Sequence, residues 1–353
     1  MPADIDMSAL PCNVKFSDLQ LFRRAQERTY CESPSEESVS PVSSELKKRS
    51  RKKVSEAIPP QPPVRKLPHI IFGEYDIQSL YHSSYPREFD YAEKIYICEL
   101  CLKFMRSGEF FKSHQSVCRW LNPPGDEIYR KDGLSVFEVD GRTSELYCIN
   151  LCLLSKLFLK DKVLFYDVEP FLFYVLCRYD RGFRLVGYFS KPKCAGECNL
   201  SCVMVLPPYQ RSGYGRFLID FSYFLSRYDG TWGTPDKPLS QFGQLAYYSY
   251  WKSAILQYFH RLNSKNVRRD GVSIHQIRAA TGISAPDVVN TLVKLRFLRK
   301  ISHYVYPSGS GFVLDIDWNL VRSTVALNRN GICIDPLAFK PSSEYQPSVS
   351  SKK

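Results

Sequence analysis

The spacing of apolar residues predicts a run of short β-strands that begins near residue 67. Apolar residues there form short clusters bounded by polar, Gly or Pro residues, a pattern typical of strands. Arg181 and Gly182 form a predicted hairpin turn, and residues 123–130 form a Pro-Gly turn. We expect strands at residues 70–72, 95–98, 134–139, 163–165, 170–177 and 185–189.

Helical spacing is found in three further stretches of the chain. Apolar residues recur every three or four positions over residues 151–159, 217–225 and 242–250, so each stretch predicts a helix. Residues 272–299 predict two further helices joined by a turn at 281–284. Their inward-facing residues are expected to be Ile274, Ile277 and Ala280 on the first helix, and Val288, Val289, Leu292 and Leu295 on the second.

These last two helices have the periodicity of a helix-turn-helix, which admits two interpretations. Residues 304–306 and 312–314 could form a wing beside the helices, and the unit would then bind DNA. Alternatively, the two helices are a packing module that borders a substrate groove.

A strand, a glycine-bearing turn and a helix follow one another around residues 200–225. Pro207 and Pro208 stop the apolar run, and QRSGYG at 210–215 leads directly into the helix. Two glycines let backbone N–H groups approach a ligand, and the helix N-terminus adds partial positive charge. The arrangement suits a pyrophosphate, although the same residues could form only a tight turn.

Charge and cysteine content narrow the class of protein. The 353 residues carry 48 Lys+Arg against 36 Asp+Glu, a net charge of +12, which favours an acidic partner such as nucleic acid, chromatin or an anionic cofactor. Without an apolar N-terminal leader or a run of 18 apolar residues, we expect a soluble intracellular protein with no membrane partner. The 12 cysteines then indicate free thiols and metal ligands rather than disulfides.

Both ends of the chain have the composition of disordered segments. Residues 1–64 are rich in Ser, Glu and Pro, and residues 341–353 form a Ser-rich tail. Six of the seven residues from 47 to 53 are basic. This run is either a solvated charge cluster or a nuclear import signal or nucleic-acid contact.

Four residues near position 100 have the spacing of a zinc finger. Cys98 and Cys101 are separated by two residues, and His114 and Cys118 by three, so the first pair can sit on a turn and the second pair one helical turn apart. Such a set can converge on a tetrahedral zinc ion. Because all four positions are protein ligands, the zinc would be structural. Phe104 and either Phe110 or Phe111 are expected to pack beneath it.

The segment LPPYQRSGYGRFLIDFSYFLS resembles the acyl-CoA pyrophosphate loop of the N-acetyltransferase superfamily, and within it the MYST-type histone acetyltransferases. The resemblance covers about residues 65–340. It is carried also by the segments YICELCLKFM, PPGDEIYRKDGLSVFEVDG, LCLLSKLFL, YDVEPFLFYVL, LVGYFSK, PDKPLSQFG and YSYW.

The resemblance implies acetyl transfer from acetyl-CoA to the ε-amine of histone-tail lysines. A lysine amine has a pKa near 10.4 and arrives protonated, so a general base is needed. The resemblance makes Cys202 the catalytic cysteine, either as an acyl carrier or as a residue that shapes the site; by itself it could be a buried strand thiol. A backbone N–H just after Cys202 is a candidate oxyanion donor.

The predicted general base departs from the family pattern. The family has a glutamate before Lys-Pro-Leu-Ser, whereas this chain has Asp236. The aspartate reaches about 1.5 Å less, by one C–C bond, so it could act through water, through a shifted backbone, or slowly. In a Pro-rich turn it could also be only a turn-former.

The remaining site residues also follow from the resemblance. Lys162 matches the lysine that the family autoacetylates, but could be a solvated turn lysine. Arg211 and Arg216 would contact cofactor phosphates, and Ser240 could equally cap a helix. The expected acetyl-CoA contacts are Val203, Met204, Val205, Gln210, Arg211, Ser212, Gly213, Tyr214, Gly215, Arg216, Ser240 and Ser249. Cys194, Cys198 and Cys202 are four residues apart, but with no accompanying His a second metal site is disfavoured.

We therefore predict a mixed α/β fold, with a GNAT-like acyl-CoA N-acetyltransferase core. The expected parts are a disordered basic tail (1–64), a zinc-finger module (65–122), the catalytic core (123–265), a helix-turn-helix or winged-helix-like segment (266–340) and a disordered tail (341–353). For the last folded segment the resemblance favours the packing role. The alternative function is a catalytically weak or inactive chromatin or DNA-binding protein that retains CoA binding.

The resemblance also implies partners and a location. Histone tails or the nucleosome would be the substrate, and subunits of a multiprotein complex would be further partners, with weak nucleic-acid contact as an additional expectation. The expected location is the nucleus, where the protein would regulate chromatin and transcription.

Overall fold

The structure is a computed structural model that describes residues 67–160, 162, 166–180, 182–194, 196–264, 272–300, 312–327 and 332–342. The described residues belong to one compact unit, and residues 1–66 lie outside them. The predictions for residues 1–64, for the basic run at 47–53 and for a strand at 163–165 fall outside the described part of the chain.

A four-stranded sheet opens the described chain, with strand order β2-β1-β3-β4. Strands β1 and β3 are parallel, and the two outer pairs are antiparallel. The predicted strands at 70–72 and 95–98 are confirmed, although β3 ends one residue before Cys98. The elements are β1 (His69–Phe72), β2 (Tyr75–Gln78), the 3-10 helix η2 (Arg87–Phe89), β3 (Lys94–Ile97), β4 (Phe104–Met105) and helix α2 (Gly108–Val117).

A five-stranded antiparallel sheet forms the centre of the fold, with strand order β10-β8-β7-β6-β5. The expected turn over 123–130 is wrong in part, because edge strand β5 begins at Asp126. Its residues are mostly polar, and Ile128 and Tyr129 are its buried positions, so it lacks the apolar run of a central strand. The strands are β5 (Asp126–Lys131), β6 (Leu134–Asp140), β7 (Phe171–Tyr179), β8 (Phe183–Pro192) and β10 (Cys202–Val205).

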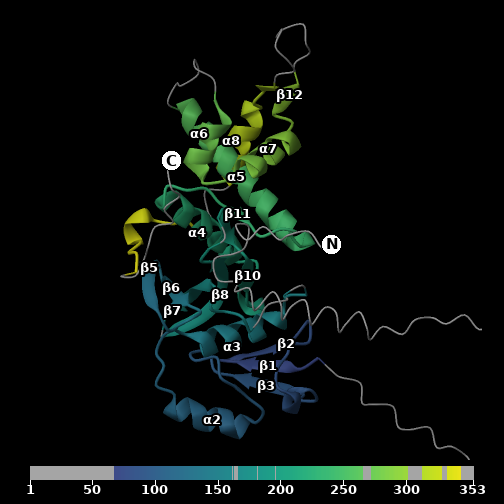
Figure 1. The fold of residues 1–353 in the computed structure, drawn as a ribbon, viewed down its shortest axis with the longest axis vertical. Coiled ribbons are helices and arrows are strands. Elements are labelled where there is room, and N and C mark those ends of the chain that lie inside the picture. Colours follow the sequence, from purple (N-terminus) through teal and green to yellow (C-terminus); the bar gives the residue numbers. More distant parts are fainter. Residues whose placement is uncertain are drawn as a thin grey trace, which may run out of the picture. The chain divides into compact units, whose positions relative to one another are not determined.

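Helix α3 (Glu145–Lys156) is drawn between the two sheets in Figure 1. Buried residues extend around most of its circumference, as expected for a helix covered on both sides. The predicted helix at 151–159 is confirmed in position but wrong in its bounds. Its polar first turn starts earlier, and Leu157 and Phe158 are buried in the turn that follows it.

The predicted strand–turn–helix is confirmed, with one break in the strand. Ser201 separates β9 (Cys198–Leu200), which pairs in parallel with β11 (Thr234–Pro235), from β10, which pairs with β8. The turn contains the 3-10 helix η3 (Pro207–Tyr209) and leads into α4 (Tyr214–Tyr228). The apolar residues that set the helical period of 217–225 are buried on α4: Phe217, Leu218, Phe221, Phe224 and Leu225.

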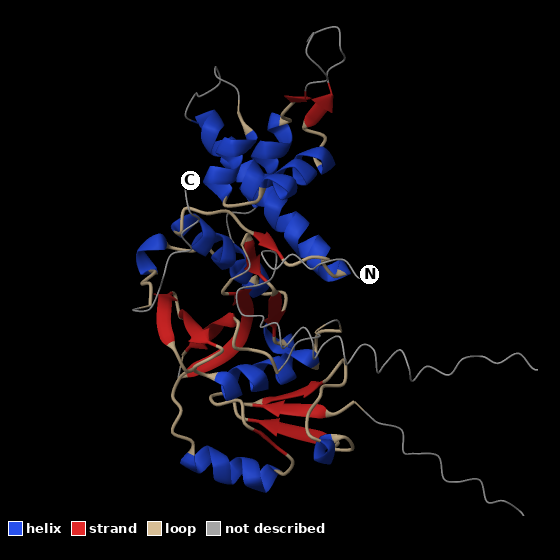
Figure 2. Ribbon diagram, in the orientation of Figure 1, coloured by secondary structure: helices blue, strands red, loops and turns tan. Residues whose placement is uncertain are grey.

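The chain after residue 241 is largely helical (Figure 2). The elements are α5 (Gln241–Ser264), α6 (Ile274–Thr281), α7 (Ala285–Lys294), β12 (Leu298–Lys300), β13 (Phe312–Leu314), α8 (Trp318–Leu327) and η5 (Pro336–Ala338). The two predicted helices and their turn are confirmed. Val289 was wrongly placed inward: it is 36% exposed, because α7 buries residues 287, 288, 291 and 292. Strand β13 pairs with β12, residues 304–306 lie outside the described residues, and the winged-helix assignment stays a prediction.

The last described segment attaches to the edge of the five-stranded sheet. Phe339 forms an isolated bridge with Tyr129 of β5 and packs against aromatic rings of α4. Lys131 forms an ion pair with Asp335 at 2.6 Å. Within the described residues, no helix has the length and apolar character that crossing a bilayer requires.

Candidate functional site

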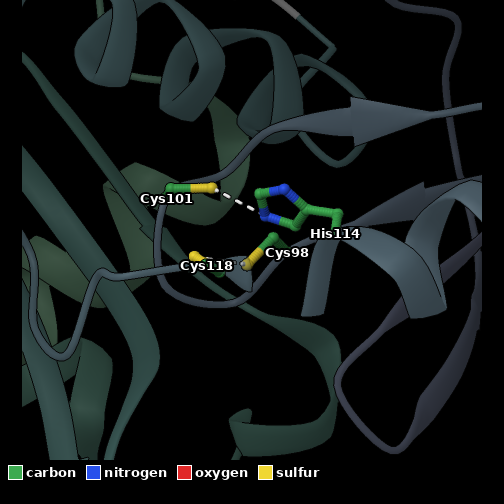
Figure 3. Close-up of side chains that lie close together, drawn as sticks. All are labelled: Cys98, Cys101, His114 and Cys118. Atoms are coloured by element: carbon green, nitrogen blue, oxygen red, sulfur yellow. Dashed lines mark hydrogen bonds between the residues drawn. The ribbon is translucent and has the colours of Figure 1, made fainter. Parts of the chain in front are cut away.

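The four predicted zinc ligands come together in the structure (Figure 3). Their ligand atoms all lie within 4.8 Å of one another. Cys101 Sγ is 3.3 Å from His114 Nε2, and Cys98 Sγ is 3.9 Å from Cys118 Sγ. Ligands placed about 2.0–2.3 Å from a tetrahedral zinc ion are separated by distances of this size. The donor set therefore fits one zinc ion, and its four protein ligands leave no open coordination position.

Local backbone geometry produces this cluster. The Leu102 amide donates to the Cys98 carbonyl oxygen at 2.9 Å, which closes the turn between the first two thiols. His114 lies on α2 and Cys118 is its C-terminal cap. Phe111 is buried beneath the cluster, whereas Phe110 is 71% exposed. Phe104 instead packs against Tyr85 and Phe89 of the main core.

The turn between β10 and α4 has the geometry of an anion cradle. Gly213, at the N-cap of α4, has φ +89°, and Arg211 also has a left-handed φ of +64°. The Phe217 amide donates to the Gly213 carbonyl oxygen, so the amides of the preceding helical residues have no acceptor within the helix. A Cβ added at Gly215 would meet Val205 Cγ2 at 3.9 Å, which leaves room for a ligand. The residues present fit a pyrophosphate.

The other expected cofactor contacts are distributed around this turn. Val203, Met204 and Val205 lie on β10, with Met204 buried. The Gln210 side-chain amide donates to the Val205 carbonyl oxygen at 3.0 Å, and Arg211 and Ser212 are exposed. Tyr214 opens α4 and is half-buried.

Three expected contacts belong to the α4–α5 region. The Arg216 guanidinium donates to Ser253 Oγ at 2.7 Å and lies over the Tyr250 ring. Ser240 accepts a hydrogen bond from the Gly243 amide at 3.1 Å and thus caps α5. Ser249 is exposed on α5. Arg216 is therefore directed toward α5, and its phosphate-binding role remains a prediction.

Cys202 lies at the start of β10 beside residues from two other parts of the chain. Lys162 Nζ is 3.7 Å from Cys202 Sγ, and the Tyr188 hydroxyl lies at the same distance from it. The Tyr188 hydroxyl also forms a 2.8 Å hydrogen bond with Ser155 Oγ. The structure therefore places a lysine ammonium group and a tyrosine hydroxyl beside the sulfur of the predicted catalytic cysteine.

Sequence reasoning missed Tyr188 and Ser155, which lie within an apolar strand and an apolar helix. The available signal was a hydroxyl at each position, because a buried hydroxyl needs a hydrogen-bond partner. Cys152 belongs to the same neighbourhood. Burial raises the pKa of its thiol, and the charge of Lys162 opposes this.

Asp236 is placed directly beside the residue that precedes Cys202. The β9–β11 pairing continues into a hydrogen bond from the Asp236 amide to the Leu200 carbonyl oxygen, at 2.8 Å. The Ser201 hydroxyl reaches Asp236 Oδ2 at 3.5 Å. The carboxylate is exposed and precedes the cis Lys237-Pro238 peptide. The sheet thus brings the predicted base near the predicted catalytic cysteine.

Comparison with known families agrees with this geometry. A sequence model of the MOZ/SAS family matches residues 122–325, which is more than half of the chain. The chain belongs to the MOZ/SAS family. The MYST family zinc finger domain matches residues 64–118, the part that holds the four clustered ligands. The predicted resemblance to the MYST type and the mixed α/β fold class are confirmed.

Several curated proteins that are similar to this chain are named histone acetyltransferases. Human histone acetyltransferase KAT6A is 51% identical over 256 residues, which are 72% of this chain and 12% of that protein. Mouse histone acetyltransferase KAT6B is 52% identical over 236 residues, 66% of this chain and 12% of KAT6B. Histone acetyltransferase mst2 of Schizosaccharomyces pombe is 47% identical over 239 residues, 67% of this chain and 57% of mst2. The matched region is thus a small part of the two mammalian proteins.

Proposed function

We propose that this protein is an acetyl-CoA-dependent lysine acetyltransferase that acts on histone tails. The observation that carries the proposal is the position of three features around β9 and β10, two strands that only Ser201 separates along the chain. The anion cradle at Gly213 follows β10, Cys202 begins β10, and Asp236 follows β11. Membership of the MOZ/SAS family and relatives named as histone acetyltransferases support the same reaction.

Acetyl-CoA would supply the acetyl thioester, held through its pyrophosphate by the turn at 210–215. The Asp236 carboxylate takes a proton from the substrate ε-ammonium, which is needed because a free lysine titrates near pH 10.4. The neutral amine then forms a bond to the acetyl carbon, the thioester C–S bond breaks, and CoA leaves as its thiol with the remaining amine proton. The exposed position of Asp236 gives a substrate or one intervening water access to it. Cys202 either carries the acetyl group or shapes the site. The 3.7 Å between Lys162 Nζ and Cys202 Sγ supports Lys162 as the autoacetylated lysine.

The substrate, partners and location form part of the proposal. Relatives named as histone acetyltransferases support histone tails or the nucleosome as substrate and the nucleus as the location. The net charge of +12 favours weak additional contact with nucleic acid. Subunits of an acetyltransferase complex complete the set of proposed partners.

The proposal is tested by following labelled acetyl transfer from acetyl-CoA to histone-tail peptides. The natural protein should label peptides that contain lysine and should not label peptides in which arginine replaces each lysine. Gly213→Val should reduce acetyl-CoA affinity, because a β-branched residue is strained at a φ of +89°.

Gly230→Val is the matched control. Gly230 also has a left-handed φ, +66°, but an added Cβ would meet nothing within 4 Å, and it lies at the far end of α4. It should retain acetyl-CoA binding. Binding of CoA without any labelling of histone peptides would contradict the proposal and favour the inactive chromatin-binding alternative.

A further inference from the structure

A buried carboxylate connects the C-terminal helices to the segment that carries Asp236. Asp287 lies in the first turn of α7 and is 2% exposed. It accepts hydrogen bonds from Thr234 Oγ1 at 2.6 Å, from Lys237 Nζ at 2.7 Å and from Ser284 Oγ at 2.9 Å. Two of these donors flank Asp236 in sequence, two residues before it and one residue after it.

The backbone makes the same connection. The Gly233 amide donates to the Gly282 carbonyl oxygen at 2.7 Å, and the Ser284 amide donates to the Gly233 carbonyl oxygen at 3.0 Å. The turn between α6 and α7 therefore pairs with the chain that enters β11, as the parallel bridge between Gly233 and Ile283 also records. On its other side, this segment is held by the hydrogen bond that the Asp236 amide donates to the Leu200 carbonyl oxygen.

The energetics require these contacts to be retained. A carboxylate with so little solvent contact is costly unless it is paired and hydrogen-bonded. Asp287 is paired with Lys237, and two hydroxyls satisfy its remaining acceptor sites. Lys237 and Thr234 are thereby held in place, and the backbone of Asp236 lies between them.

We propose that Asp287 is a positioning residue for Asp236, so that the α6–α7 turn forms part of the catalytic apparatus. The inference rests on the proposed role of Asp236 as general base. A base acts only within hydrogen-bond reach of the proton it takes, and an aspartate has little spare length. Fixing the residues on both sides of it is a direct way to meet that requirement. It also assigns the helix-turn-helix a supporting role within the core.

The proposal is tested with Asp287→Asn and Lys237→Met, each made in the natural chain and in the Asp236→Asn background. Each single change should lower kcat for acetyl transfer, on the order of tenfold to a hundredfold for a displaced catalytic group, with the KM for acetyl-CoA unchanged. In the Asp236→Asn background, either change should alter the remaining rate by less than about twofold, because no base is left to position. Equal losses in both backgrounds would show a general structural effect and overturn the proposal.

Asp229→Asn is the control for loss of a buried ion pair. The Asp229 side chain is 1% exposed and pairs with Lys191 at 3.7 Å, so its neutralisation tests the cost of losing a buried ion pair elsewhere. This variant should not show the dependence on Asp236 that Asp287→Asn shows. A similar dependence in Asp229→Asn would contradict the specific role of Asp287.

Hydrogen–deuterium exchange tests the positioning without relying on catalysis. In Asp287→Asn, the amides of Gly233 and Asp236 should exchange faster than in the natural chain, whereas in Asp229→Asn they should not. Unchanged exchange in Asp287→Asn would overturn the inference even if transfer is observed. If the natural chain transfers no acetyl group, the proposed function fails. The hydrogen–deuterium exchange of Gly233 and Asp236 then decides by itself whether Asp287 positions this segment.

Discussion

The zinc cluster and the candidate transfer site are built in different ways. The four zinc ligands lie between residues 98 and 118, and a single turn plus helix α2 brings them together. The transfer site draws on distant segments. The β8–β10 pairing brings Tyr188 to Cys202, the β9–β11 pairing brings Asp236 to the residue before Cys202, and Lys162 comes from the chain that follows α3. A local site depends on spacing, whereas a site assembled from distant segments depends on the whole topology.

This difference predicts that the two sites respond differently to loss of a cysteine. Cys101→Ala removes a zinc ligand, and structural zinc contributes free energy to folding. We expect the zinc-to-protein ratio to fall from one to near zero and the thermal midpoint to fall by more than about 10 °C. Cys202→Ala should keep the zinc and cost only about 1 kcal/mol, as a change at a half-buried strand position.

Cys177→Ala provides the control for the zinc experiment. Cys177 is fully buried on β7 but lies outside the cluster, so its removal should lower stability without releasing zinc. Metal analysis and thermal unfolding on the same samples measure both quantities. Retention of zinc and of the thermal midpoint by Cys101→Ala would contradict the account of the cluster.

A smaller effect tests whether the distant segments of the transfer site really meet. Lys162→Met removes the ammonium group that lies 3.7 Å from Cys202 Sγ. Two charges about 4 Å apart interact by about 1 kcal/mol even in water. Alkylation of Cys202 by iodoacetamide at pH 7 should therefore slow by about fivefold.

Lys160→Met is the matched control, because it removes a lysine charge only two residues away. Its rate of alkylation should equal that of the natural chain. Equal slowing by both substitutions would indicate a general charge effect, and no slowing by Lys162→Met would show that this lysine does not face the thiol in solution.

Sequence reasoning identified the features that depend on local spacing, and it missed the features that depend on contacts between distant parts of the chain. Cys98, Cys101, His114 and Cys118 were identified by their spacing alone, and the helix after Gly213 by its apolar period. Their geometry is confirmed because a turn and a helix place such residues without help from the rest of the chain.

The errors have physical causes as well. Strand β5 is an edge strand whose polar residues hide its pairing with β6. Val289 is adjacent to Val288, and both are apolar. The sequence does not show which of the two faces the core, because that depends on which face of α7 is covered. Ser155 lies within an apolar helix, and its relation to Tyr188 depends on how α3 packs against β8. Asp287 in a helix first turn has the appearance of an ordinary dipole-stabilising residue, and only the fold brings it to Lys237.

The most direct test of the central claim is acetyl transfer to a histone-tail peptide by Asp236→Asn and Asp236→Glu, each confirmed to hold zinc and to be folded. The account predicts that the Asn variant loses about 10²- to 10⁴-fold in kcat, the range expected for removal of a general base. The Glu variant keeps a carboxylate and should remain active. Turnover by Asp236→Asn equal to that of the natural protein would contradict the claim that the β9–β11 pairing delivers the catalytic base.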